Sequence, residues 1–599
     1  MCGIVGYIGK KPIKNELIRM LRLLEYRGYD SAGIGVIKNG KINVFKSVGN
    51  ITSLEKALPK QIDSTIGIGH TRWATHGKPT LLNAHPHCSQ SGEFAVVHNG
   101  IIENYKELKQ PLELLGTKFY SSTDTEVIAK LLEQAKGNTV ISKIISTANK
   151  LSGSFALAIL HRDDPNTIFV AKQKSPLFVG NDGAQAFVAS DPACINSAAV
   201  TTYSLSDGEF AAVTCSKITF YNSRGEEISR EPINAPTIMQ ESAAKKTKYY
   251  MKKEIAEIPD CLSSIINYYA DEKVFSYFSA EKIKSIKRIK LVGCGTAYHA
   301  CEMGASFLEK YFKKEATAHI ASEFRYSCPI INKNTLCIFI SQSGETADTI
   351  GAADLAKKSG APTVVITNCL HSTLAKMADC VLPVLAKREV AVASTKAFVG
   401  QVAVCYALAG YLAKTASKRG KKLDYLTNLN LLNSAYKIYP KAALTKLINM
   451  LTPAKDAFFI GRGNDYIICQ EASLKIKEIC YINCNAYPAG ELKHGFIALV
   501  EDGTIMFTVA TNKSLLPKTL NGINEVKSRG GKIILVSQFK EPDIEAGLCA
   551  EQITLPDAPE DLMPLIAISP LFSLAYYTSL ARGNNPDMPR NLAKSVTVE

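Results

Sequence analysis

The chain has 599 residues, more than one hydrophobic core accommodates, and the usual size of a domain predicts about four units. Hydrophobic residues make up 46% and charged residues 21% of the chain, a composition that excludes disordered and fibrous proteins. The net charge of +15 is spread over single and paired lysines, so attraction to phosphorylated small molecules explains it as well as nucleic acid does, and we expect no nucleic-acid partner.

Cysteine usage and the start of the chain predict a cytoplasmic protein. The 16 cysteines contain no C-x-x-C pair and are too dilute for a disulfide framework. Lysines follow the first apolar residues directly, so no secretory signal is expected. The charge-free stretches 397–413 and 562–581 are interrupted by Gln401 and by Pro564 and Pro570, which favours buried helices over membrane spans. We therefore expect no association with a membrane.

The first 230 or so residues predict short strands with few helices. Asn39 and Gly40 lie between two apolar runs and indicate a hairpin over 34–45. The further elements expected here are strands at 65–69, 93–97 and 154–160 and helices at 105–115 and 125–134. This pattern predicts a layered domain built on antiparallel sheets.

Beyond residue 240 the pattern changes to apolar strand, glycine-rich turn and long helix, which is typical of parallel α/β units. Two segments of this half align at an offset of 168 residues, which places Gly293 and Gly295 on Gly461 and Gly463. The sequence thus predicts two tandem, doubly wound parallel α/β domains after the first domain. The expected boundaries are 1–240 for the first domain, 241–250 for a linker, 251–430 and 431–590 for the two repeats, and 591–599 for a tail.

Cys2 is the residue of the first domain that most strongly indicates a catalytic function. Removal of Met1 leaves the Cys2 thiol beside a free α-amine, whose ordinary pKa of about 7.7–8.0 allows it to act as the base of an N-terminal nucleophile. A cysteine at position 2 is more often incidental, so this assignment depends on the residues around it.

A polar loop follows at 70–77, where Arg72 and Trp73 stand together. The planar guanidinium of Arg72 suits a small carboxylate, although the loop is equally well read as a structural one anchored by Trp73. A zinc site in this region would have to be built from His85, His87, Cys88 and His98. Their spacing fits no familiar ligand pair, so we expect no metal.

Two motifs in the first domain have both a structural and a chemical interpretation. The sequence His98-Asn99-Gly100 is typical of a type I′ turn, or forms an oxyanion hole from the Asn99 amide and the Gly100 N–H. Asp124 precedes an expected helix, where it either favours the helix N-terminus or holds a substrate ammonium.

In the second half, residues 338–346 run from an apolar strand into Ser-Gln-Ser-Gly-Glu-Thr before a helix. Hydroxyls and backbone N–H groups at a helix N-terminus bind anions, so this segment favours a phosphate site over an ordinary cap. Residues 393–396, Ala-Ser-Thr-Lys, are a weaker match of the same kind. Tyr298 stands where the dinucleotide motif that starts at Gly293 needs its third glycine, which disfavours a nicotinamide or flavin cofactor.

Several charged residues in the last third of the chain have a purely structural explanation when each is considered alone. Glu471, Lys475 and Glu478 have helical spacing and predict a solvated face with salt bridges. His494 lies in a glycine-flanked segment, and the tail at 589–599 is typical of a frayed end.

Taken together, these motifs resemble the family of isomerising glutamine–fructose-6-phosphate aminotransferases from one end of the chain to the other. In the first domain the resemblance rests on CGIVGYIG, EYRGYDSAG, HTRWATHG, NAHPH, HNGIIENY and TDTE. In the second half it rests on SQSGETADT, ASTKAF, GRG, KEI, AGELKHG and RNLAKSVTVE. The resemblance implies a class II glutaminase domain of the N-terminal nucleophile (αββα) fold, two tandem sugar isomerase (SIS) domains and a catalytic tail. It also implies a homodimer that makes glucosamine 6-phosphate and glutamate from fructose 6-phosphate and glutamine, the first step of amino-sugar biosynthesis.

At the glutaminase site, the resemblance implies that Cys2 attacks the glutamine amide while Asn99 and Gly100 form the oxyanion hole. Arg72 would hold the carboxylate of glutamine, and Asp124 its α-amine. The loop closing over glutamine would contain Thr75, His76 and Gly77, and Trp73 would gate an internal channel for ammonia.

At the isomerase site, the resemblance implies that Lys594 forms a Schiff base with the open-chain ketose. Glu478 would move a proton between C1 and C2, with Lys475 as an accessory group, and His494 of a neighbouring subunit would open the sugar ring. The phosphate would bind to Ser341, Gln342, Ser343 and Thr346, with Thr296 nearby. No metal or organic cofactor is expected, because an imine and a carboxylate suffice for this proton transfer.

One departure and two other functions remain to be weighed. Ala297 stands where family members often have a serine, so one hydroxyl contact to the sugar phosphate is expected to be missing. The second repeat lacks the hydroxyl-rich segment and is expected to have lost phosphate binding.

Two alternative functions are disfavoured. A sugar-phosphate deglycase with an inert glutaminase half does not explain the intact Cys2, and a non-catalytic sensor does not explain Glu478 and Lys594.

Overall fold

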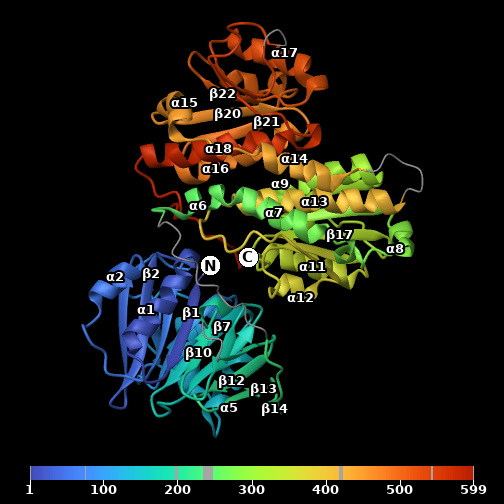
Figure 1. The fold of residues 1–599 in the computed structure, drawn as a ribbon. Coiled ribbons are helices and arrows are strands. Elements are labelled where there is room, and N and C mark those ends of the chain that lie inside the picture. Colours follow the sequence, from blue (N-terminus) through green and yellow to red (C-terminus); the bar gives the residue numbers. More distant parts are fainter. Residues whose placement is uncertain are drawn as a thin grey trace. The chain divides into compact units, whose positions relative to one another are not determined.

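The computed structural model describes residues 2–74, 76–195, 200–233, 247–416, 423–540 and 544–597. The chain divides into two compact units, Met1–Lys246 with Ser595–Glu599, and Thr247–Lys594 (Figure 1). The expected linker at 241–250 falls mostly on residues outside the described ranges. The two units are taken in turn.

In the described part of the first unit, the strands form two seven-stranded antiparallel sheets. One has the order β11-β9-β10-β1-β4-β2-β3 and the other β14-β13-β12-β8-β7-β6-β5. The strands are β1 (Gly3–Ile8), β2 (Ser31–Lys38), β3 (Lys41–Val48), β4 (Ile66–Arg72), β5 (His87–Cys88), β6 (Phe94–Ile102), β7 (Gly153–His161), β8 (Ile168–Gln173), β9 (Phe178–Asn181), β10 (Ala186–Ala189), β11 (Thr201–Ser204), β12 (Glu209–Val213), β13 (Ile218–Tyr221) and β14 (Glu227–Ile228). The helices are α1 (Ile13–Leu24), α2 (Ile51–Ala57), α3 (Tyr105–Leu114), α4 (Glu126–Gln134) and α5 (Val140–Ala148).

The alternation of apolar residues along these strands produces a four-layer αββα domain. Side chains such as Ile4, Ile68 and Val97 fill the space between the two sheets. The opposite face of the first sheet packs against α1 and α2, which lie beside it in Figure 1, through residues such as Val5 and Leu21. The second sheet packs in the same way against α3, α4 and α5. The predicted layered, antiparallel architecture is confirmed.

The hairpin predicted at Asn39-Gly40 is also confirmed, with φ angles of +51° and +66° that suit a type I′ turn between β2 and β3. In contrast, the type I′ turn considered for His98-Asn99-Gly100 is wrong, because β6 continues through these residues to Ile102. Both sides of the motif carry apolar residues that belong to one long strand paired with β7, so the Asn-Gly pair does not break it.

In the described part of the second unit, two five-stranded parallel sheets have the orders β16-β15-β17-β18-β19 and β21-β20-β22-β23-β24. The strands are β15 (Arg288–Gly293), β16 (Glu315–Ile320), β17 (Thr335–Ser341), β18 (Thr363–Thr367), β19 (Cys380–Pro383), β20 (Asp456–Gly461), β21 (Asn483–Pro488), β22 (Ile505–Val509), β23 (Lys532–Ser537) and β24 (Glu551–Thr554). The helices are α6 (Tyr250–Ala256), α7 (Ile258–Tyr269), α8 (Ala280–Ser285), α9 (Thr296–Phe307), α10 (Ala321–Phe324), α11 (Ala347–Lys358), α12 (Thr373–Met377), α13 (Lys396–Ala416), α14 (Tyr425–Ala435), α15 (Thr445–Leu451), α16 (Asn464–Cys480), α17 (Leu516–Lys527) and α18 (Met563–Ala581).

The identical strand order confirms the internal repeat and the tandem parallel α/β prediction. In each copy, a glycine with positive φ (Gly295 at +52° and Gly463 at +57°) turns the chain from the first strand into a helix, α9 or α16. These two helices contact each other and, with α13 and α18, form one continuous core (Figure 1). The side chains of α16 can therefore reach the loops of the first repeat.

The two apolar stretches noted in the sequence are helices α13 and α18. Both are long and apolar enough to cross a membrane, but 89% and 94% of their most apolar windows are buried inside the protein. The prediction of buried core helices is confirmed for both.

Candidate active sites

The first candidate site lies in the first unit, where β1 begins and β4 ends. Cys2 directly precedes β1, and its Sγ lies 3.6 Å from the carbonyl oxygen of Trp73. Burial raises the pKa of the Cys2 thiol above its usual value, while the positive charge of Arg72 acts in the opposite direction. The resting group is a thiol, so a base must take its proton before it attacks.

Arg72, the last residue of β4, is only 3% exposed. Its Nη2 donates to the carbonyl oxygens of His76 and Gly77, the latter at 3.0 Å, and so holds the loop after β4. Its Nη1 is buried and has no hydrogen-bond partner among the described residues. Because a buried, unpaired guanidinium nitrogen is costly, this end of Arg72 is suited to a carboxylate ligand.

Asp124 is 4% exposed and lies in the segment before α4. Its Oδ2 accepts the N–H of Ile102, the last residue of β6, at 2.8 Å. Glu126, at the start of α4, accepts the backbone N–H groups of Tyr120 and Ser121 and so ties down the preceding loop. Glu126 therefore ties down the loop before the helix, whereas Asp124 accepts its hydrogen bond from β6 and not from the helix N-terminus. The role of Asp124 toward a substrate ammonium stays a prediction.

Asn99 and Gly100 lie on β6, opposite Ala156 and Phe155 of β7. Asn99 is 5% exposed. Gly100 has a φ of +132°, and a Cβ atom at this position would lie 2.0 Å from the carbonyl oxygen of Ser154. Only glycine fits this backbone, which explains its presence in the middle of a long strand.

Four buried histidines on and beside this strand, His70, His85, His87 and His98, form a network. The rings of His70 and His85 stack with centroids 4.1 Å apart, and His85 meets His87 edge-on at 4.8 Å. His87 contacts Thr123 Oγ1 at 3.1 Å. Among the described residues, no group of three or more His, Cys, Asp or Glu side chains is placed to hold a metal ion. Hydrogen bonds and ring contacts account for these histidines.

Burial lowers the pKa of all four histidines, in the case of His70 to about 3. The unfolded chain binds protons on them below its ordinary histidine pKa of about 6.5, whereas the folded domain does not. The contribution of these histidines to the free energy of unfolding is therefore fully present above pH 6.5. We expect the free energy of unfolding to fall as the pH drops below that value, by about 1.4 kcal/mol per pH unit for each histidine.

This expectation is measured by urea unfolding between pH 7.5 and 4.5, followed by the fluorescence of Trp73, the only tryptophan in the chain. Replacing His87 by glutamine should reduce the slope by about one proton, whereas the same change at the exposed His494 should leave it unaltered. A free energy of unfolding that stays constant from pH 6.5 to 5 would contradict the prediction.

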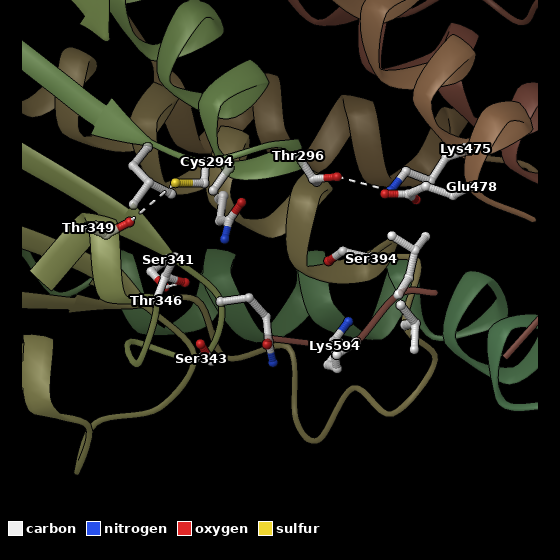
Figure 2. A pocket seen from close by; sticks show the side chains of 17 residues that line it. Cys294, Thr296, Ser341, Ser343, Thr346, Thr349, Ser394, Lys475, Glu478 and Lys594 are labelled. Carbon is white, nitrogen blue, oxygen red and sulfur yellow. Dashed lines mark hydrogen bonds and ion pairs between the residues drawn. The ribbon is translucent and has the colours of Figure 1, made fainter. Parts of the chain in front are cut away.

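The second candidate site is a cavity of about 160 Å³ in the second unit (Figure 2). It is enclosed by the loops after β15 and β17, by the segment before α13, by α16 and by the C-terminal tail. The residues lining it are Cys294, Thr296, Ala297, Ile340, Ser341, Gln342, Ser343, Thr346, Thr349, Val392, Ser394, Gln401, Lys475, Glu478, Leu592, Ala593 and Lys594.

One end of the cavity is rich in hydroxyl groups. Figure 2 shows Ser341, Ser343 and Thr346 together there, at the N-terminal end of α11. Ser341 Oγ lies 3.2 Å from Thr346 Oγ1 and accepts the N–H of Gly344 at 3.0 Å. Gly344 has a φ of +64°, and a Cβ there would meet Ser372 Oγ at 2.0 Å. This tight turn presents hydroxyl and backbone N–H groups in the way that suits a phosphate.

The second repeat fills the corresponding place with its own carboxylate. Asp465, which aligns with Ala297 in the repeat, is 4% exposed and accepts the N–H of Thr511 at 2.8 Å and its hydroxyl at 2.5 Å. An internal anion thus occupies the segment after β22, which supports the expected loss of phosphate binding there.

At the other end, α16 contributes charged side chains that are buried. Lys475 is 1% exposed, and its Nζ donates to Glu478 at 2.8 Å and to Thr296 Oγ1 at 3.0 Å. Glu471, also buried, lies 3.4 Å from the same Nζ and accepts from His299 Nδ1 at 2.7 Å. Burial acts to lower the pKa of Lys475, but Glu471 and Glu478 raise it above its usual value. The solvated face predicted for this helix is wrong, because helical spacing alone does not reveal that a second domain covers it.

Lys594 enters the cavity from the C-terminal tail and is fixed by Glu389. The side chain of Lys594 is 3% exposed, and its Nζ lies 2.5 Å from Glu389 Oε2. Burial raises the pKa of Glu389, but Lys594 and donors such as Ser394 and Thr395 lower it to about 2. Lys594 and Glu389 thus form a buried ion pair, in which the lysine keeps the Glu389 carboxylate ionised.

The structure thus assembles most of the residues predicted from the sequence. Trp73, His76 and Gly77 lie near Cys2 or Arg72 in the first unit, whereas Thr75 is outside the described residues. Thr296, Ser341, Gln342, Ser343, Thr346, Lys475, Glu478 and Lys594 all line the cavity of the second unit. His494 is exposed and does not line it. The cavity that a single copy of the chain forms therefore lacks the imidazole that the resemblance implies.

Two polar residues with buried side chains, one paired with Lys594 and one lining the cavity, were not among the predicted site residues. Glu389 contacts Lys594 but lies 205 residues away, in a segment with no motif of its own. Gln401 is 1% exposed, and its Oε1 has no partner among the described residues. Gln401 is the lone amide in the charge-free stretch 397–413, and this position could have indicated a functional role, since buried amides need a partner.

Comparison with known proteins matches both units. Residues 71–197 match the family model of the glutamine amidotransferase domain, and residues 282–410 and 450–581 each match that of the SIS domain. The chain is 42% identical over 612 residues to the glutamine–fructose-6-phosphate aminotransferases [isomerizing] of Caldanaerobacter subterraneus subsp. tengcongensis and of Clostridium tetani, covering 100% of each chain. Among solved structures, the C-terminal domain of glucosamine-fructose-6-phosphate aminotransferase from Francisella tularensis matches with a TM-score of 0.53 and 32% identity. That match covers 57% of this chain and 99% of the other.

Proposed function

The chain belongs to the family of isomerising glutamine–fructose-6-phosphate aminotransferases, and from this premise we propose how its own residues perform the reaction. The enzyme converts fructose 6-phosphate and glutamine to glucosamine 6-phosphate and glutamate. We propose that the buried cluster around Cys2 releases ammonia from glutamine and that the cavity around Lys594 attaches it to the sugar.

In the glutaminase half, Cys2 Sγ attacks the amide carbon of glutamine, and the α-amine freed by removal of Met1 takes the thiol proton. The raised pKa of the thiol makes such a base necessary. The tetrahedral oxyanion is stabilised by the Asn99 amide and the Gly100 N–H. The α-ammonium gives its proton to the amide nitrogen, so that collapse expels ammonia and leaves a thioester at Cys2, which water hydrolyses to glutamate.

Glutamine is held by its two charged ends. The unpartnered Nη1 of Arg72 receives the α-carboxylate, and the buried carboxylate of Asp124 receives the α-ammonium. The loop containing Thr75, His76 and Gly77 closes over the substrate, since Arg72 already holds the carbonyls of His76 and Gly77.

A substitution of Arg72 is the most direct test of how the carboxylate of glutamine is bound. Replacing Arg72 by lysine keeps the positive charge but removes the fork, so we expect the KM for glutamine to rise by about 10- to 100-fold, the range that loss of a charge-assisted contact of about 1.5–3 kcal/mol covers. The activity of the isomerase half should not change. Glutaminase kinetics at fixed fructose 6-phosphate measure the effect, with Arg162→Lys, an exposed residue of the same unit, as the control. An unchanged KM would exclude Arg72 as the carboxylate ligand.

In the isomerase half, Ser341, Gln342, Ser343 and Thr346 bind the phosphate of fructose 6-phosphate, with Thr296 at the other side of the cavity. This proposal is supported by the tight turn at Gly344 and by the N-terminus of α11, which together present neutral donors to a dianion. The methyl group of Ala297 lines the same cavity and supplies no hydroxyl there.

Catalysis at the other end of the cavity requires the Lys594 amine in its neutral form. Once Nζ has lost its proton to water, it attacks C2 of the open-chain ketose, and water leaves as the imine forms. Ammonia displaces Lys594 from C2 and leaves a C2 imine. Glu478 then carries a proton from C1 to C2, while the C1 hydroxyl loses its proton and the imine nitrogen gains one, which gives the 2-amino aldose. Lys475 positions the Glu478 side chain through their 2.8 Å ion pair.

Two further proposals concern the assembly. His494 opens the sugar ring from a partner subunit, because it is exposed and does not line the cavity of its own chain, and the enzyme is therefore a homodimer. Ammonia passes from one site to the other inside the protein, with Trp73 as its gate, because free ammonia is mostly protonated at neutral pH.

We also propose a cytoplasmic location and the domain boundaries 1–240, 251–430 and 431–590.

The observation that carries the proposed function is the convergence of Lys594, Glu478 and the hydroxyl-rich turn on one cavity (Figure 2). The test supplies purified enzyme with glutamine and fructose 6-phosphate and quantifies glutamate and glucosamine 6-phosphate together. Equal amounts of both products are expected. Glutamate without amino sugar would overturn the roles assigned in the isomerase half, and release of ammonia from glucosamine 6-phosphate alone would favour a deglycase.

A further inference from the structure

His70 is a buried side chain of the first unit to which the mechanism above gives no role. It lies on β4, two residues before Arg72, and is 0% exposed. Its Nε2 lies 2.9 Å from the carbonyl oxygen of His98 and 3.1 Å from Asn99 Oδ1. His70 thus touches the side chain that the proposed function places in the oxyanion hole.

These two contacts determine the tautomer of His70. Burial lowers its pKa to about 3, so the ring is neutral and carries one proton. The His98 carbonyl can only accept a hydrogen bond, so the proton is on Nε2. The Asn99 atom next to this N–H must also be an acceptor, which fixes Oδ1 toward His70 and turns the Nδ2 amide group away from it.

Neighbouring histidines hold the ring of His70 in place. His85 stacks on it with an interplanar angle of 11°, and His85 Nδ1 accepts the backbone N–H of His98 at 3.2 Å. His98 in turn contacts Thr125 Oγ1 at 2.8 Å and the Ser154 carbonyl oxygen at 3.4 Å. The network leaves the His70 ring little freedom to rotate, and it connects the ring to the strand that carries Asn99.

We propose that His70 is a positioning residue of the glutaminase reaction, which orients the Asn99 amide so that its N–H groups face the oxyanion that forms when Cys2 attacks. Among the described residues, Asn99 Nδ2 donates to no protein acceptor, so it is available for that role. Without the His70 donor, the amide can rotate and present its oxygen, which repels the oxyanion. This inference rests on the proposed function, because it assumes that Asn99 stabilises the oxyanion.

The test compares His70→Leu with His70→Gln. Leucine has a similar size but no donor, whereas the amide nitrogen of glutamine reaches about as far as Nε2 of histidine. We expect His70→Leu to lower kcat for glutamine hydrolysis by about 10²-fold, as loss of one oxyanion donor does, with little change in KM. His70→Gln should recover at least about tenfold of that loss. Alkylation of Cys2 by iodoacetamide should proceed at the wild-type rate in both variants, because no oxyanion forms in that reaction.

A double-mutant cycle separates this inference from the proposed function. Asn99→Ala alone is expected to lower kcat by about 10²-fold or more, and adding His70→Leu to it should cause no further loss. If Asn99→Ala leaves kcat unchanged, the proposed oxyanion hole fails. If Asn99→Ala lowers kcat but His70→Leu lowers it equally in both backgrounds, or if the leucine and glutamine variants are equally impaired, the positioning role of His70 is overturned.

Should His70→Leu not fold, as judged by Trp73 fluorescence and thermal unfolding, His70→Asn replaces it. Its shorter amide places a donor near Nδ1 rather than Nε2, so it should resemble the leucine variant in kcat. Equal kcat values for His70→Asn and His70→Gln would overturn the inference.

Discussion

Replacing Cys2 by alanine is expected to abolish glutamine hydrolysis and, with it, the formation of glucosamine 6-phosphate from glutamine. The nucleophile acts as a unit with its base and with the oxyanion donors, so its removal should lower kcat by about 10⁴-fold or more. Binding of glutamine should persist, because Arg72 and Asp124 are buried side chains whose contacts do not include the Cys2 sulfur. Stopped assays of glutamate and amino sugar, with calorimetry for glutamine binding, measure both effects.

A matched control is Cys215→Ala. Cys215 is a half-buried cysteine of the same unit whose Sγ contacts the carbonyl oxygen of Ile8, away from the site, and its removal should leave both products unchanged. The role of the α-amine is checked separately by intact mass, because enzyme that retains Met1 should hydrolyse no glutamine. Wild-type activity in a preparation that retains Met1 would contradict N-terminal nucleophile catalysis, even if Cys2 itself proved essential.

The fold could be predicted because each unit repeats one local pattern many times. Alternating strands and the Asn39-Gly40 hairpin gave the antiparallel sheets, and the strand–glycine–helix repeat gave the two parallel domains. Where a prediction depended on a single motif, it was wrong. The Asn99-Gly100 pair favours a turn by local preference, but pairing of β6 with β7 on both sides of it keeps the strand continuous.

The candidate sites were predicted wherever a functional residue stood inside a motif. Ser341, Ser343 and Thr346 are recognisable because strand, glycine and helix follow in one short segment. Lys475 and Glu389 illustrate the limit. Lys475 contacts Thr296 over a separation of 179 residues, and only the packing of α16 against the first repeat makes it buried instead of solvated. Such contacts depend on how two domains pack, which local sequence does not encode.

The histidine network shows a related limit. His85, His87, Cys88 and His98 were considered as zinc ligands because they cluster in sequence, and the sequence could not show which ring nitrogen faces which oxygen. In the structure, burial lowers the pKa of His70 and His98, and the carbonyl oxygens of His98 and Ser154 face a ring nitrogen of each, so these acceptors determine which nitrogen carries the proton. The same buried histidines are then available to orient catalytic groups, which a titrating or metal-bound ring would not do in the same way.

Replacing Lys594 by arginine is expected to abolish amino-sugar formation while leaving glutamine hydrolysis within a few-fold of the wild type. Arginine keeps a positive charge opposite Glu389, so the buried carboxylate stays paired, but a guanidinium does not form an imine with a ketose. We therefore expect glucosamine 6-phosphate formation to fall by about 10³-fold or more, the scale on which loss of a covalent nucleophile acts.

Borohydride reduction in the presence of fructose 6-phosphate supplies the direct evidence for the imine. Hydride adds to the C=N carbon, so wild-type enzyme should carry a stable secondary amine on the peptide that contains Lys594, and the arginine variant should carry none. Lys358→Arg, at an exposed ion pair with Asp354 in the same unit, should be trapped like the wild type. An adduct on a different lysine, or amino-sugar formation by Lys594→Arg at more than about a tenth of the wild-type rate, would show that the sugar is activated without Lys594.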